Sequence, residues 1–320
     1  MLLLVKVLNF FSEKYDTIRL SQILGSDTMY KLGDLEIHRA IESEVPIFDT
    51  FTFFPDATRD VVEANKDWLM PRYIDPKTIE IILCIQSYII KTSHHTILVD
   101  TCVGNHKSRP ARPSWHMQNA PFIEELANVG VHPEEVDFVL CTHLHVDHVG
   151  WNTKLVDGRW VPTFPNAKYI FSRNEYELWE SRHENGAAVP VPLVYEDSVL
   201  PIVEAGQAII VEDTHQIDDG MWLEPAPGHT PGHVMLNLKS REETALMSGD
   251  AIHHPIQLIR PEWSSRACED PHMSAVSRTK MLERVADTNT LLCPAHFGSP
   301  TMGHVISHPN GGFRYRLINS

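Results

Sequence analysis

The stretch Cys141-Thr-His-Leu-His-Val-Asp-His-Val-Gly150 directly follows an apolar run, Val136 to Cys141, that indicates a buried strand. Residues two apart in an extended segment point the same way, so His143 and His145 can share one ion while Leu144 faces the core. One aspartate and a third histidine follow within three residues. Zinc favours imidazole nitrogen and carboxylate oxygen, whereas an isolated histidine is more often a core or surface residue. The stretch therefore predicts four metal ligands, His143, His145, Asp147 and His148.

Three later segments repeat this placement of a histidine or aspartate just beyond a strand. They are Gly228-His-Thr-Pro-Gly-His233, Ser248-Gly-Asp250 and Cys293-Pro-Ala-His-Phe-Gly298. Each alone is a weak signal, because polar residues at strand ends are common. Their order and their common position after predicted strands add three candidate ligands, His229, Asp250 and His296.

Together these motifs resemble the successive metal motifs of the metallo-β-lactamase superfamily, and Leu98-Val-Asp-Thr101 resembles its first motif. The resemblance covers residues 33 to 316, nearly the whole chain. It implies an αββα sandwich of two mixed sheets flanked by helices, with two Zn²⁺ at one edge. The implied roles are a first zinc on His143, His145 and His229, a second on Asp147, His148 and His296, a bridge by Asp250, and support of the ligand imidazoles by Asp100 and Thr142.

The spacing of the ligands resembles one branch of that superfamily. From His143 to His229 is 86 residues, then 21 to Asp250 and 46 to His296. The branch contains methyl parathion hydrolase and, with a shorter first interval, the N-acyl-homoserine lactonases. The main zinc β-lactamases carry a cysteine ligand where Asp250 stands. Glyoxalase II shares the seven-ligand scheme and stays open, although no obvious basic cluster for glutathione is present.

The resemblance implies hydrolysis of an ester or lactone by a hydroxide that bridges the two metals. Asp147 or Asp250 would carry the proton. His253 stands where the lactonases usually carry a tyrosine that contacts the substrate oxyanion. It is a candidate hydrogen-bond donor or general acid, and the competing interpretation is a solvated loop pair with His254.

Aromatic residues near the motifs are candidates for the wall of a substrate pocket. They occur within Phe48–Phe54, Trp115–Met117 and Trp151–Asn152 and at Trp263. A rim of this kind favours a small, apolar, uncharged substrate, and core packing is the competing interpretation. Trp151 is the strongest candidate, because it directly follows the metal turn. The predicted wall residues are Phe51, Trp115, Trp151 and Trp263.

Charge and cysteine content limit the partners and the compartment. The 320 residues carry a formal net charge of −15, which disfavours nucleic acid and anionic membrane surfaces as partners. Five cysteines without a C-x-x-C pair indicate core residues in a reducing compartment, so we expect a cytoplasmic protein. No apolar run reaches the roughly 18 residues of a membrane span.

The chain divides into an N-terminal extension, residues 1–31, and one hydrolase domain, residues 32–320. The extension is a candidate arm for a homodimer. Strands and helices interleave through the domain, which indicates an α/β layered fold. Predicted strands are 35–41, 79–91, 95–100, 136–141, 169–172, 208–212, 221–225, 234–239, 244–248 and 290–293. Predicted helices are 120–129, 173–182 and 274–286.

The function that the sequence favours is zinc-dependent hydrolysis of an ester or lactone in a small-molecule substrate. Hydrolysis of organophosphate triesters is an alternative on the same ligands. An iron-dependent oxidoreductase resembling the persulfide dioxygenases is another, and manganese is a further candidate metal. A binding protein that merely keeps the fold is disfavoured, because a degenerate site is expected to lose at least one ligand.

Overall fold

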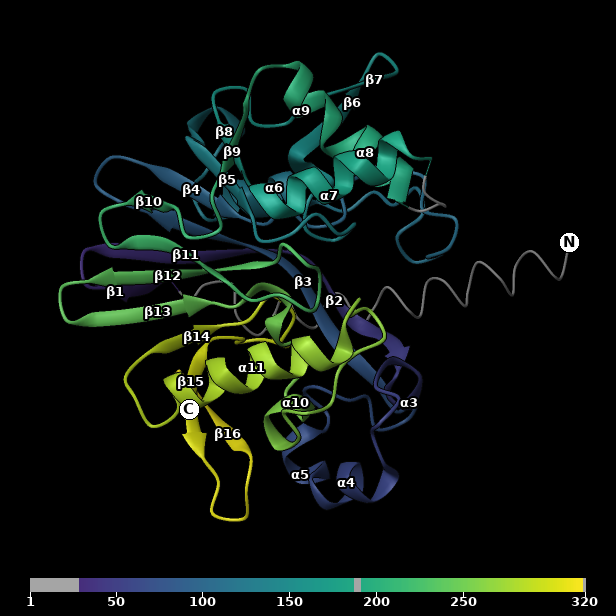
Figure 1. Cartoon of the computed structure of the whole chain (residues 1–320), viewed down its shortest axis with the longest axis vertical. Helices are drawn as coiled ribbons and strands as arrows, with labels where there is room; N and C mark the ends of the chain where they lie inside the picture. The colour runs from purple at the N-terminus through teal and green to yellow at the C-terminus, as the bar shows by residue number, and fades with distance from the viewer. Residues whose placement is uncertain (1–28, 187–190, 319–320) are drawn as a thin grey trace, which may run out of the picture.

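Two seven-stranded sheets packed face to face form the centre of the molecule, and helices cover both outer faces (Figure 1). The computed structural model describes residues 29–186 and 191–318, so most of the predicted N-terminal arm lies outside the described residues. Each sheet is built from a continuous part of the chain, residues 30–211 for the first and 216–317 for the second. The chain therefore passes from one sheet to the other once, at residues 212–215.

The first sheet is antiparallel at one side and parallel at the other. Its first four strands pair antiparallel and its last three are joined parallel, so the loops after β4, β5, β8 and β9 leave at the same edge. In spatial order its strands are β1 (Tyr30–Leu32), β2 (Leu35–Asp49), β3 (Glu80–Lys91), β4 (Thr96–Val99), β5 (Phe138–Cys141), β8 (Lys168–Ser172) and β9 (Ala208–Val211).

The second sheet is antiparallel except between β13 and β14, which pair parallel. In spatial order its strands are β10 (Gln216–Asp218), β11 (Met221–Pro225), β12 (Val234–Ser240), β13 (Glu243–Met247), β14 (Leu291–Cys293), β15 (Gly303–Ser307) and β16 (Phe313–Leu317). A separate hairpin pairs β6 (Thr153–Val156) with β7 (Arg159–Pro162).

The strands are apolar on both faces because each sheet is covered on both sides. In β4, Ile97 and Val99 face the second sheet while Leu98 packs in the helix-side cluster. In β13, Met247 faces the first sheet while Leu246 packs in the opposite cluster under α11. Such strands appear in the sequence as nearly continuous apolar runs instead of alternating ones.

Helices form the two outer layers of the sandwich. The first sheet is covered by α6 (Phe122–Asn128), α7 (Arg173–Glu184), α8 (Val191–Ser198) and α9 (Leu200–Glu204), and the second by α10 (Ile256–Ile259) and α11 (Pro271–Val285) (Figure 1). Three short helices follow β2, namely α3 (Thr50–Phe53), α4 (Arg59–Ala64) and α5 (Lys66–Leu69). Single 3₁₀ turns lie at η1 (Pro133–Glu135), η2 (Gly150–Asn152) and η3 (Gly249–Ala251). The predicted αββα sandwich is confirmed.

All five cysteines are free and buried, which confirms their prediction as core residues. In the parts of the chain that the structure describes, we find no helix with the length and hydropathy needed to cross a bilayer.

Candidate metal centre

Strand ends and one tight turn carry all seven predicted ligands to the same edge of the two sheets. Four ligands follow the end of β5, and His229 lies in the turn between β11 and β12. Asp250 follows β13, and His296 follows β14. Because β13 and β14 are parallel, the loops after them leave at the same edge, which brings the last two ligands together. We call the seven side chains the metal floor.

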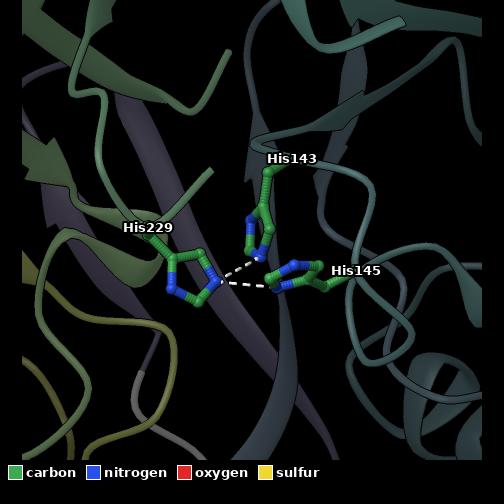
Figure 2. A group of neighbouring side chains, drawn as sticks. All are labelled: His143, His145 and His229. Carbon is green, nitrogen blue, oxygen red and sulfur yellow. Dashed lines mark hydrogen bonds between the residues drawn. The ribbon is translucent and has the colours of Figure 1, made fainter. Parts of the chain in front are cut away.

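His143, His145 and His229 form the first group (Figure 2). The Nε2 atom of His229 lies 3.0 Å from Nε2 of His143 and 2.8 Å from Nδ1 of His145. The three rings approach one another from two different loops, and their nitrogens converge on one point. This is the arrangement of three imidazole ligands around one ion.

Asp147, His148 and His296 form the second group. The Nε2 atoms of His148 and His296 are 3.2 Å apart, and Asp147 Oδ2 is 3.7 Å from His296 Nε2. Asp250 lies between the two groups: its Oδ2 is 3.2 Å from His229 Nε2 and its Oδ1 is 3.0 Å from His296 Nε2. The carboxylate of Asp250 therefore directs one oxygen toward each group of ligands.

The hydrogen bonds behind the rings determine which nitrogen of each ring is directed at the metal floor. Asp100 and the carbonyl oxygen of Cys84 only accept, so Nδ1 of His148 and Nδ1 of His296 must donate to them, at 2.8 and 2.9 Å. When these rings are neutral, as metal ligation requires, Nε2 of each is an acceptor, and the two Nε2 atoms lie 3.2 Å apart. Among the residues that the structure describes, none donates a hydrogen bond to the buried Oδ1 of Asp250. A cation between these atoms would accept a lone pair from each nitrogen and from the carboxylate oxygen. The residues therefore fit a bound metal.

The charges at the metal floor are arranged to attract a cation. Burial lowers the pKa of His143 and His229 well below the usual value, and that of His145 to about 4, so these rings are neutral as metal ligation requires. For His148 and His296 burial acts in the same direction, but the carboxylates around them, Asp250 foremost, raise the pKa instead. The negative electrostatic potential of these carboxylates, which favours a proton on His148 and His296, also favours a metal ion between them.

Asp100 and Thr142 support the ligands from behind. Asp100 accepts hydrogen bonds from the backbone N–H of Thr142 at 2.8 Å and from its hydroxyl at 2.9 Å, besides the bond from His148. Because the hydroxyl proton goes to Asp100, the Thr142 oxygen is free to accept from Nδ1 of His143 at 3.1 Å. One carboxylate thus orients a ligand in each metal group, as ligand histidines generally require.

His233 orients the loop that carries Asp250. Its Nε2 accepts a hydrogen bond from the backbone N–H of Asp250 at 2.9 Å, and burial lowers the pKa of His233 to about 3. Gly249, at φ 47°, allows this approach, because a Cβ there would lie 2.6 Å from Nε2 of His233. The second histidine of the G-H-T-P-G-H motif is therefore a positioning residue.

Glu175, which the sequence reasoning missed, joins the two histidine loops from the first turn of α7. Its Oε1 accepts from the backbone N–H of Leu144 at 3.0 Å and from the indole of Trp179 at 2.8 Å. Its Oε2 accepts from the hydroxyl of Thr230 at 2.7 Å and from Gly232 N–H at 3.2 Å. Burial raises the pKa of this carboxyl group, and the hydrogen bonds from Leu144, Thr230 and Trp179 oppose that rise. The sequence signal was Ser172-x-x-Glu175, which resembles a helix capping box and gives no hint of the metal loops.

A pocket of about 330 Å³ opens above the metal floor. His145, Asp147, His229, Asp250 and His296 line its base, and Phe48, Phe53, Arg112 and Trp115 line the side that we call the pocket wall. Other lining residues include Arg109, Trp179, Arg182, Val194 and Glu269. The metal floor is thus accessible to a small molecule through a mostly apolar channel.

The structure brings only Trp115 of the four predicted wall residues to the pocket. Trp151 packs in the core instead, stacked on Phe122 with ring centroids 5.4 Å apart and its indole N–H bonded to Glu42 at 2.7 Å. Trp263 packs in the cluster beneath α3–α5, and Phe51 lies under the guanidinium of Arg59. In the segment 48–54, the pocket is lined instead by Phe48, near the end of β2, and by Phe53, in the helical turn α3.

His253 faces both the metal floor and the pocket. Its Nε2 lies 3.2 Å from Asp250 Oδ2, and its ring packs against the edge of Phe53 at 5.8 Å. The solvated pair interpretation is wrong, since His253 and His254 are 2% and 0% exposed. His254 is tied into the fold by a 2.8 Å hydrogen bond from Nε2 to the carbonyl oxygen of Tyr73.

Cys268 lies behind the first metal group and was treated only as a core residue in the sequence. Its sulfur is 3.7 Å from Nδ1 of His229 and 3.3 Å from the hydroxyl of Ser274. It therefore contacts the ring nitrogen that does not face the metal floor. No sequence pattern connects it to the G-H-T-P-G-H motif.

Comparison with known proteins agrees with this geometry. Residues 85–296 match the metallo-beta-lactamase superfamily. An N-acyl homoserine lactonase of Bacillus thuringiensis is 26% identical over 180 residues, 52% of this chain and 62% of the relative. The chain therefore spans less than two thirds of that relative's length. Metallo-beta-lactamase domain-containing protein 1 of Xenopus laevis is 30% identical over 218 residues, covering 67% of this chain and 70% of the relative.

Solved structures share the fold over almost the whole chain. The hydrolase AbOPH in the beta lactamase superfamily superposes with a TM-score of 0.75 at 25% identity, covering 91% of this chain and 97% of that one. AidC, a dizinc quorum-quenching lactonase, superposes with a TM-score of 0.71 at 21% identity, covering 92% and 97%. The matched motifs, the sandwich and the convergent ligands lead to one conclusion: this chain belongs to the metallo-beta-lactamase superfamily.

Proposed function

We propose that this protein is a dinuclear zinc hydrolase that cleaves an ester or lactone bond in a small molecule with an apolar body. The observation that carries the proposal is the convergence of seven nitrogen and oxygen ligands at the base of an apolar pocket. His143, His145 and His229 would hold one ion, Asp147, His148 and His296 would hold the other, and Asp250 would contact both. When bound, two such ions activate water and polarise the carbonyl oxygen of the substrate.

Side chains of the pocket supply the remaining roles. Asp147 and Asp250 line the pocket and carry acceptor oxygens for the proton that the reacting water loses. His253 directs Nε2 toward the metal floor, where its N–H can donate to the oxyanion that develops on the substrate. Phe48, Phe53 and Trp115 exclude water from one side of the substrate.

Two comparisons support the ester or lactone bond over other linkages. The curated relative from Bacillus thuringiensis is an N-acyl homoserine lactonase, and AidC is a dizinc lactonase with the same fold. Neutral imidazoles and carboxylates also suit zinc, which binds nitrogen and oxygen in tetrahedral or five-coordinate sites. We infer two Zn²⁺ per chain.

The test is a substrate screen on the metal-loaded protein with and without a chelator. Nitrophenyl esters, acyl-homoserine lactones, aryl lactones and phosphotriesters are compared, and metals are counted by elemental analysis. We expect about two zinc ions per chain and chelator-sensitive hydrolysis of carboxylic esters or lactones. Hydrolysis of phosphotriesters alone would move the proposal to that class, and one iron without zinc would favour an oxidoreductase.

A matched pair of histidine variants separates the metal from the fold. His143→Ala removes a ligand, and His272→Ala makes the same change at an exposed position on α11. We expect His143→Ala to lose activity and zinc while keeping its circular dichroism spectrum, and His272→Ala to match the wild type. Hydrolysis that survives in His143→Ala, or that is insensitive to chelator, contradicts the mechanism.

A further inference from the structure

Three arginines line the pocket, and two of them are already paired. Arg109 forms two hydrogen bonds with the carboxylate of Asp197, at 2.7 and 2.8 Å. Arg182 pairs with Glu269 in the same way, at 2.7 and 2.6 Å. Arg112 is exposed, and within the described residues it forms no ion pair. The pocket therefore offers one arginine whose charge is not matched by the protein.

A row of aromatic rings connects Arg112 to the metal floor. The guanidinium carbon of Arg112 lies 5.6 Å from the ring centroid of Phe48. Phe48 stacks on Phe53, with centroids 4.8 Å apart and an interplanar angle of 1°. Phe53 in turn meets the ring of His253 at 5.8 Å, and His253 contacts Asp250. One side of the pocket thus runs from the metal floor over two flat apolar faces to a cation.

We propose that the substrate carries a carboxylate at the end remote from the scissile bond, and that Arg112 binds it. This inference rests on the proposed hydrolase function and names its substrate class: an ester or lactone with an apolar middle and an anionic end. A guanidinium matches a carboxylate with two parallel hydrogen bonds, and packing against Phe48 holds it on the pocket side. The substrate therefore differs from the uncharged molecule that the aromatic residues alone suggest.

The position of Arg112, at the end of the pocket wall away from the metal floor, determines how it would act on a substrate. A chain with a net charge of −15 repels anions at long range. Arg112 should therefore strengthen the binding of a substrate that has already entered the pocket, and should change its association rate only a little. The ions of the metal floor attract the carbonyl group, and Arg112 attracts the opposite end. A substrate held at both ends is aligned along the Phe48–Phe53 faces.

The experiment uses two matched series of 4-nitrophenyl esters on the zinc-loaded protein. One series consists of monoesters of dicarboxylic acids with 4 to 10 carbons, which have a free carboxylate at the far end. The other series has that carboxylate capped as a methyl ester. We expect kcat/KM for the free acids to pass through a maximum at one chain length and to exceed that of the capped ester there. Raising the salt concentration should weaken only this preference.

Arginine variants assign the preference to one residue. Arg112→Met, which keeps the apolar stem, should raise KM for the preferred free acid by about tenfold, the effect of losing one charge-assisted contact. KM for the capped ester should rise much less than KM for the free acid, and Arg112→Lys should restore part of the difference. Arg59→Met is the control, because Arg59 also covers a phenylalanine, Phe51, but lies outside the pocket lining.

The outcomes distinguish this inference from the proposed function. Equal kcat/KM for free and capped esters in the wild type, or equal losses on both in Arg112→Met, overturns the carboxylate assignment while leaving the hydrolase intact. Failure to hydrolyse either series, together with the lactones, contradicts the hydrolase itself.

Discussion

The metal floor and the pocket wall lie next to each other but are built in different ways. The ligands of the metal floor are mostly buried and lie directly after strands or in a tight turn, and Asp100 fixes rings in both groups. The pocket wall comes from the end of β2, from the short helical turn α3 and from the loop between β4 and α6, and Arg112 is exposed. Metal binding depends on the strand ends that carry the ligands, whereas substrate selection would depend on the pocket wall. We therefore expect variants to change metal binding and substrate preference independently.

The largest effect is expected from Asp250→Asn. Asp250 faces both groups of ligands, so an amide in its place removes a negative charge that the proposed pair of ions would share. We expect activity to fall on the order of 10³-fold or more, and the zinc content to fall toward one ion or none. Asp67→Asn on the exposed helix α5 is the control, with zinc measured by elemental analysis. Full zinc content in Asp250→Asn would show that this carboxylate does not bridge.

Glu175→Ala should weaken the metal floor without touching an ion. Three hydrogen-bond donors on the two loops and the indole N–H of Trp179 lose their acceptor, which costs about 3 kcal/mol or more in the free energy of unfolding. Zinc affinity should fall about 10–100-fold, because the loops are no longer held together. Glu177→Ala, an exposed residue of the same helix, should change neither by a measurable amount.

Glu175→Gln refines this prediction, because an amide keeps one acceptor oxygen. We expect an intermediate zinc affinity by competition with a chromogenic chelator, and partial recovery of activity at saturating zinc. If Glu175→Ala binds zinc as tightly as the wild type, the carboxylate stabilises the fold only.

Phe53→Ala should change substrate preference and leave the metal content unaltered. Phe53 stacks on Phe48 and touches His253, so its loss removes the middle of the pocket wall. For esters with a long apolar body we expect kcat/KM to fall by about tenfold, mainly through KM. Phe51→Ala tests the neighbouring ring that does not line the pocket and should leave KM unchanged. Equal effects of both variants would contradict the assignment of the wall.

Lys107→Met should have the smallest effect on activity but a distinct pH signature in stability. Lys107 is buried, donates to Thr153 and to the backbone of Asp197, and lies 3.8 Å from the ring of Trp160. Burial lowers its pKa to about 7, while the carboxylate of Asp197 opposes the shift. Between pH 7 and about 10.4 the unfolded state then binds more protons than the folded state, so the contribution of Lys107 to the free energy of unfolding rises with pH.

Chemical denaturation of wild type and Lys107→Met at pH 6, 7, 8 and 9 checks this sign. The difference between the two proteins should be nearly constant below pH 7. Above pH 7 it should shift in favour of the wild type by up to about 1.4 kcal/mol per pH unit. A difference that stays flat, or that shifts in favour of the variant, contradicts the lowered pKa.

Sequence reasoning predicted the metal floor because each ligand adjoins a predicted strand or the turn between two strands. The same runs fixed most of the strands: β11 was expected at 221–225 and is found at Met221–Pro225. β2 was expected to end at Ile41 but continues to Asp49, because two irregularities in its pairing with β3 shift the alternation of side chains. Such bulges hide the continuation of a strand from a pattern of period two.

Other elements had a signal that the reasoning did not use. Asp157-Gly158 separates β6 from β7, and both residues have positive φ, 49° and 77°, as expected for the favoured two-residue hairpin turn. The short helices α3, α4 and α5 have no such signal, since four to six residues show too little periodicity. The pocket wall could not be predicted for the same reason: whether Phe51 or Phe53 faces the pocket depends on the orientation of a single helical turn.

The single passage of the chain between the sheets, at residues 212–215, divides each of the two groups of candidate metal ligands. His143 and His145 precede this point and His229 follows it; Asp147 and His148 precede it and His296 follows it. A backbone cut there yields two polypeptides, each holding only part of every coordination sphere. Zinc uptake by the mixed fragments would then report their reassembly, and the ion itself would hold the two pieces together.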